Sequence, residues 1–171
     1  MPQVDKVAKH TLTLPSKVYG ALKVAAEKQG LEAHELIQNL IVQHVITAGT
    51  LDDETKAELE AYRWLVDRVV DVARQRLLAG KPIESLTPDT LAECVADPEW
   101  AAKYRFYVQD DIFKNGNPRK GPINREFGFR IRAALDADVM KDDNGKPVLK
   151  KVLGGIIQSY TPFVSFDKTK I

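Results

Sequence analysis

The first fifty residues combine one short strand pattern with two helix patterns, and this combination constrains the fold most strongly. Residues 8–14, AKHTLTL, alternate polar and apolar side chains, as in a half-buried strand. Helical periodicity follows over about residues 16–29 and 33–46. A lone strand lacks a partner, and two short helices bury too little apolar surface to fold alone. We therefore expect two copies to associate, strand against strand, above four interlocked helices.

The limits of these elements follow from helix-capping residues. Pro15 ends the strand, and Ser16 is suited to cap the first helix. Gly30 ends that helix, and Gly49 punctuates the end of the second. We therefore take residues 1–50 as one domain and residues 51–171 as another.

The segment TLTLPSKVYGALKVAAEKQGLEAHELIQNLIVQHV resembles the ribbon-helix-helix family, the class of MetJ, Arc and CopG. The features that match are the strand ending at Leu14-Pro15, the Val18/Leu22 helix, Gly30-Leu31, and Glu35-Leu36-Ile37 in the second helix. The resemblance implies a homodimer whose antiparallel β-ribbon enters the major groove of double-stranded DNA.

The same resemblance implies which residues contact DNA. Lys9, Thr11 and Thr13 would read the bases, and the start of the second helix would hold a phosphate through its backbone amides. The family usually has Ser or Thr at the cap of that helix, where this chain has Glu32. Because a carboxylate repels phosphate, the contact is expected to be weakened or to move to Ala33 and His34.

Residues 51–171 indicate helices followed by short strands. A long connecting helix is expected from a cap at Thr50 or Asp52 to about residue 79, and Gly80-Lys81-Pro82 closes it. Thr87-Pro88 and Asp97-Pro98 predict helices over about 88–96 and 98–112. The expected fold class is mainly α with short β: a ribbon-helix-helix, a long connecting helix and a small α+β domain.

The segment INREFGFRIRAAL leaves two interpretations open. A helix would place Phe127, Ile131, Ala134 and Leu135 inward, whereas a strand would place Phe127, Phe129 and Ile131 on one face. Gly128 weakens the helical interpretation without deciding the matter. Asp143-Asn144-Gly145 predicts a hairpin turn, and IIQSYTPFVSF predicts a closing strand.

A second, weaker resemblance concerns residues of about 98–165. WAAKYRFYVQDD, INREFGFRIRAAL and NGKPV are similar to the winged-helix domain of phage and plasmid primases. The resemblance implies DNA-phosphate contacts from a basic set, namely Lys114, Arg119, Lys120, Arg125, Arg130 and Arg132. The equal alternative is a small α+β domain for oligomerisation or partner binding, whose basic residues are simply solvated.

Charge is distributed unevenly, although the net charge is only +1. Residues 51–98 contain six Lys or Arg and eleven Asp or Glu, whereas residues 99–171 contain fourteen and nine. This basic last third is consistent with nucleic-acid binding.

Sequence motifs for catalysis are missing. The chain has no Walker-type glycine loop, H-E-x-x-H, G-x-S-x-G or C-x-x-C, its three histidines are scattered, and Cys94 is its only cysteine. We expect no enzymatic activity, no cofactor and no metal site. Neither a signal-peptide core nor an apolar stretch of membrane-spanning length is present, so a cytoplasmic protein without membrane contact is expected.

The function predicted first is that of a sequence-specific, homodimeric transcriptional regulator, with higher-order assembly on repeated sites possible. One alternative is a relaxosome, partition or replication accessory protein of a mobile element, which the primase-like tail favours. An antitoxin ranks third, because antitoxin tails are usually short and disordered whereas residues 51–171 have the pattern of a folded domain. A dimerisation adaptor that does not bind DNA is the remaining alternative.

Overall fold

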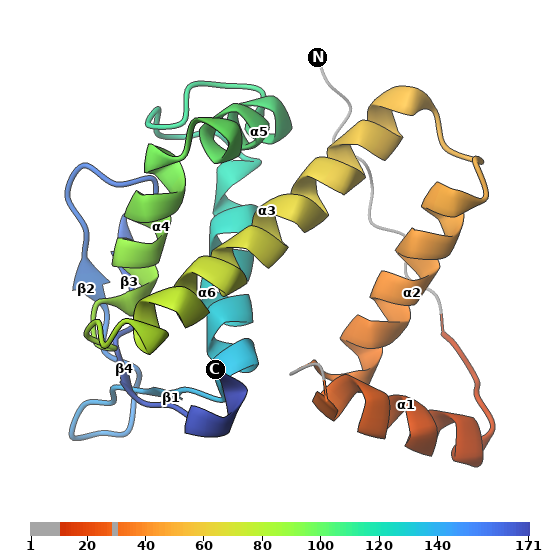
Figure 1. Cartoon of the computed structure of the whole chain (residues 1–171), viewed down its shortest axis with the longest axis horizontal. Helices are drawn as coiled ribbons and strands as arrows, with labels where there is room; N and C mark the ends of the chain where they lie inside the picture. Colours follow the sequence, from red (N-terminus) through yellow and green to blue (C-terminus); the bar gives the residue numbers. More distant parts are fainter. Residues whose placement is uncertain (1–10, 29–30) are drawn as a thin grey trace.

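The computed structural model describes residues 11–28 and 31–171, which form a mainly helical molecule with short antiparallel strands (Figure 1). Its helices are α1 (Ser16–Lys28), α2 (Ala33–Thr47), α3 (Asp53–Leu78), α4 (Leu86–Ala96), α5 (Pro98–Val108) and α6 (Lys120–Leu135). The strands are β1 (Asp138–Val139), β2 (Lys150–Lys151), β3 (Ser159–Tyr160) and β4 (Phe163–Ser165), followed by a 3-10 turn, η1 (Lys168–Lys170). None of the described helices is both long and apolar enough to cross a bilayer.

The first two helices lie near their predicted limits. α1 begins at Ser16 directly after Pro15, and α2 begins at Ala33 after Glu32, whose carbonyl accepts the Leu36 amide at 3.1 Å. The predicted strand over 8–14 falls partly outside the described residues, and residues 11–14 have irregular backbone. A ribbon strand gains its hydrogen bonds only from a second chain, so this pairing stays a prediction.

Capping residues set the limits of the next helices, with one difference from expectation. Of the two predicted caps of α3, Asp52 is the one used, since its carboxylate accepts the Thr55 amide at 2.8 Å. Asp97 caps α5 as predicted, accepting the Glu99 amide at 2.9 Å. Thr87 is not a cap. α4 starts at Leu86, before the predicted start at residue 88, and Thr87 is buried in its first turn. Pro88 fits inside this first turn because amides there need no helical partner.

Helix α5 is shorter than predicted, and α6 settles the ambiguous segment. α5 ends at Val108 because Gln109 adopts a left-handed conformation with φ 55°. Residues 120–135 form a helix rather than a strand, with Phe127, Ile131 and Leu135 buried together with Ala134. The helical alternative is therefore confirmed.

The continuous core lies entirely in the C-terminal part, where α3 packs against α4, α5 and α6. At its centre, Trp100 stacks on Tyr104 with ring centroids 4.9 Å apart and contacts Phe127 at 5.7 Å. All core members lie between Leu65 and Phe163. Helices α1 and α2 pack on each other, and none of their described side chains belongs to this core.

The strands form two small antiparallel pairs. β1 pairs with β4, and β2 pairs with β3. The predicted turn lies between β1 and β2 in the chain, and Gly145 in it has φ 76°. The Asp142 carboxylate accepts hydrogen bonds from the amides of Asn144 and Lys146. An isolated antiparallel β-bridge joins Lys141 to Pro147. The predicted closing strand is present as two short pieces, β3 and β4, separated at Pro162. These segments lie beside α6 and α4 (Figure 1).

Candidate nucleic-acid interface

The N-terminal helix pair exposes apolar side chains that a self-sufficient domain would bury. Among the described residues 11–28 and 31–50, the buried apolar ones are Ala26, Ala33, Leu36 and Ile46. Six larger apolar side chains are exposed and define what we call the N-terminal apolar surface: Leu12, Val18, Tyr19, Val24, Leu40 and Ile41. The surface includes both helices: Val24 on α1 is 53% exposed and Ile41 on α2 is 54% exposed. Such a surface on so small a unit marks a contact region.

The residues predicted to contact DNA from this unit are partly accessible. Thr11 and Thr13 are exposed, whereas Lys9 lies outside the described residues. At the start of α2, His34 is exposed and the Ala33 side chain is buried. An Ala33 contact with phosphate would therefore involve its backbone amide, as the first turn of a helix offers.

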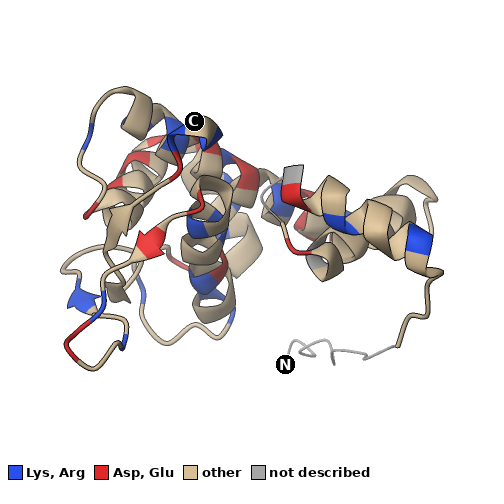
Figure 2. Cartoon of the chain, turned by 90° about the horizontal axis from the view of Figure 1, so that it is seen from below, with Lys and Arg blue, Asp and Glu red and all other residues tan. Residues whose placement is uncertain are grey.

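The basic residues of the C-terminal part do not form one cluster. Figure 2 shows Lys and Arg interspersed with Asp and Glu over this region. Arg119 donates to the Glu58 carboxylate at 2.9 Å and to the Tyr107 carbonyl at 3.1 Å, which ties it to α3 and α5. Arg130 pairs with Glu126 at 2.6 Å, one turn earlier on α6. These two arginines are engaged within the fold.

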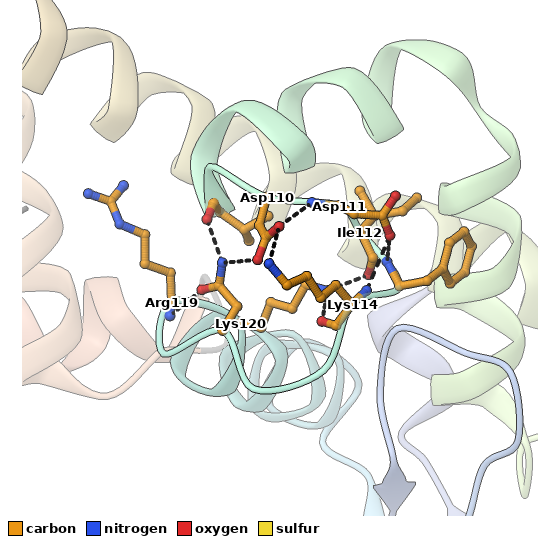
Figure 3. A network of polar contacts seen from close by, with 9 residues as sticks. Asp110, Asp111, Ile112, Lys114, Arg119 and Lys120 are labelled. Carbon is orange, nitrogen blue, oxygen red and sulfur yellow. Dashed lines mark hydrogen bonds and ion pairs between the residues drawn. The ribbon is translucent and has the colours of Figure 1, made fainter.

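Lys120 departs most clearly from the sequence-based expectation of a phosphate contact. Its side chain is only 7% exposed, and Nζ donates to the Ile112 carbonyl at 2.8 Å and to the Lys114 carbonyl. In Figure 3 it lies beneath the loop between α5 and α6, while Arg119 points away from that cluster. Burial lowers the pKa of Lys120 below its usual 10.5. We therefore assign Lys120 to loop packing and leave it out of the candidate interface.

The remaining members of the basic set, Lys114, Arg125 and Arg132, line a groove of about 710 Å³. One wall is a face of α6, and the opposite side comes from residues around β2 and β3. Phe129, also on this wall, is 44% exposed. The sequence patterns did not single out Phe129 as a functional residue. A helical projection of 120–135 places it beside Arg125 and Arg132, so the signal was present once the helix was known.

Comparison with known proteins adds no assignment: no family model, curated protein or solved structure matches the chain. The two resemblances therefore stay predictions. The two candidate contact regions of the chain are the N-terminal apolar surface and the basic groove.

Proposed function

We propose that this chain is a homodimeric DNA-binding transcriptional regulator whose N-terminal ribbon-helix-helix domain reads double-stranded DNA. One observation carries the proposal: a two-helix unit, whose described part buries four apolar residues, exposes six in the N-terminal apolar surface. Specific interfaces bury roughly 1,200–2,000 Å² in total, and apolar residues dominate their centres. A second copy would cover this surface and at the same time supply the missing partner strand.

The accessible threonines support the DNA-binding half of the proposal. Thr11 and Thr13 are two residues apart, so in a ribbon they project from the same face and, with Lys9, meet successive base edges in the major groove. Since a Thr hydroxyl cannot make the bidentate base contacts of Arg or Asn, specificity would be distributed over both copies of the ribbon.

Two measurements test the proposal. Sedimentation equilibrium should show a dimer for the wild type and a monomer for Val24→Lys/Ile41→Lys. Leu78→Lys/Leu153→Lys is the matched control, because these leucines are 67% and 96% exposed outside the helix pair. If the first variant stays dimeric, the N-terminal apolar surface is not the dimer interface.

DNA reading is tested by selection from a pool of random duplexes, followed by anisotropy titration of the selected duplex. The wild type should enrich one motif, and Lys9→Ala/Thr11→Ala/Thr13→Ala should lose the preference for it. A dimer that selects no motif at low salt would instead be an adaptor that does not read DNA, and the proposed function would be wrong.

A further inference from the structure

The groove beside α6 has a one-sided charge. Among the described residues that line it, four are Lys or Arg and none is Asp or Glu. The Lys120 ammonium group donates hydrogen bonds to backbone carbonyls, and Lys114 forms an ion pair with Asp110 at 3.2 Å. Arg125 and Arg132 differ, because neither has an ion-pair partner among the described residues. The groove therefore offers two guanidinium groups to an anion.

The two arginines are arranged around an aromatic ring. Arg125, Phe129 and Arg132 stand at i, i+4 and i+7 on α6, so they share one helical face. With a rise of 1.5 Å per residue, the two arginine backbones are about 10 Å apart along the helix axis, and Phe129 lies between them. Among the described residues, Arg132 has one hydrogen bond, from Nε to the Ala137 carbonyl at 3.2 Å. Its terminal nitrogens are left to bind a ligand.

The space above this face is open. A Cβ atom added at Gly128, in the middle of α6, would meet no heavy atom within 4 Å apart from the backbone of the helix itself. Across the groove lie Tyr160 and the amide side chain of Gln158, which approaches Asn115 at 3.4 Å. The lining thus combines guanidinium groups, the exposed Phe129 ring, the half-buried Tyr160 ring and amides that both donate and accept hydrogen bonds.

We propose that this groove binds nucleotide units of single-stranded nucleic acid, with phosphates on Arg125 and Arg132 and a base against Phe129. A guanidinium group can donate two parallel hydrogen bonds to a phosphate, and an aromatic ring can stack on any base. A groove of this volume is larger than a bare phosphate needs and falls in the range of organic-ligand sites. A duplex cannot place its stacked bases against a ring inside a concave groove, whereas a single strand can.

This inference goes beyond the proposed function and does not depend on it. Duplex reading uses the N-terminal ribbon, while the groove lies wholly within the C-terminal part. A free nucleotide has the same phosphate and base chemistry as one unit of a strand, so the experiment includes both.

The test measures fluorescence anisotropy of a labelled oligothymidylate of about twelve nucleotides with the full-length protein. Arg125→Gln/Arg132→Gln and Phe129→Leu should each weaken binding about tenfold or more. Arg105→Gln/Lys168→Gln removes the same charge at exposed positions outside the groove lining and should bind as the wild type does. Far-ultraviolet circular dichroism establishes that each variant is folded.

Competitors and one further variant separate the possible outcomes. Displacement of the oligonucleotide by thymidine monophosphate at comparable concentration identifies a free-nucleotide site, and weak displacement identifies a strand site; both support the proposal. Equal binding by groove and control variants overturns it, as does binding that pyrophosphate displaces and Phe129→Leu leaves unchanged. The Lys9→Ala/Thr11→Ala/Thr13→Ala variant should retain single-strand binding. If this variant loses single-strand binding while the groove variants keep it, the proposal is overturned.

Discussion

The hydroxyl group of Tyr104 donates a hydrogen bond to Oδ1 of Asn124 at 2.7 Å, and the Asn124 amide donates to the Ile156 carbonyl at 2.9 Å. This chain of contacts joins α5, α6 and the segment before β3. Burial raises the pKa of Tyr104 to about 12, so the hydroxyl stays a donor throughout the physiological range. Asn124 also lines the basic groove, which links the wall of that groove to the core.

Asn124→Ala should lower the free energy of unfolding by about 1–3 kcal/mol, since it leaves a buried hydroxyl and a carbonyl without partners. Urea denaturation followed by tryptophan fluorescence measures the change, since one of the two tryptophans, Trp100, stacks on Tyr104. Asn144→Ala, in the exposed hairpin turn, is the control and should change little. Equal stability of the two variants would show that the Asn124 bonds contribute nothing.

Lys120→Met should also destabilise the fold, by about 1–3 kcal/mol, because the carbonyls of Ile112 and Lys114 lose their donor. Lys114→Met, which breaks an exposed pair with Asp110, should cost less than about 1 kcal/mol. Affinity for duplex DNA should be unchanged in folded Lys120→Met. A selective loss of duplex affinity would restore Lys120 as a phosphate contact.

Cys94 should be unreactive in the native protein. Burial raises the pKa of its thiol to about 12, so only about one molecule in ten thousand would hold a thiolate at pH 8. An aromatic disulfide reagent should label it slowly in buffer and stoichiometrically in denaturing urea. Rapid labelling without denaturant would contradict the buried placement of Cys94 on α4.

The Asp52 cap should make stability depend on pH in the acid range. Hydrogen bonds from the Thr55 amide and hydroxyl hold the pKa of Asp52 below its usual 3.8. Because the folded-state pKa is the lower one, the stabilisation is present above about pH 3.8 and is lost as the pH falls through the folded value.

Asp52→Asn keeps an acceptor at the cap but cannot titrate. The wild type should therefore exceed this variant in urea midpoint at about pH 7, and the difference should shrink at about pH 2.5. Asp53→Asn removes a charge one residue along without removing a cap bond, and it serves as the control. A difference that stays constant across this range would exclude the Asp52 carboxylate as its source.

Local sequence determined most of the helices. The capping carboxylates of Asp52 and Asp97, the break at Pro15 and the turn at Gly145 act through their own backbone neighbours, so they could be predicted without a fold. The prediction of Thr87 as a cap was wrong because proline is tolerated at several positions of a first turn. With Leu86 buried, α4 starts earlier in the chain, at Leu86 itself.

Only the tertiary structure decided what residues 114–135 do. The letters around Gly128 fit a helix or a strand, and Phe127 is inward in both. Burial of Ala134 and Leu135, with Phe129 44% exposed, is the arrangement that only the helix gives. The choice of helix then set the partners of the basic set: Glu58 engages Arg119, loop carbonyls engage Lys120, and Arg125 and Arg132 are left facing the groove. Charge can be counted from the sequence. Whether a charge is paired or available depends on residues far away in the chain, because ion pairs and burial are set by distances that only the fold creates.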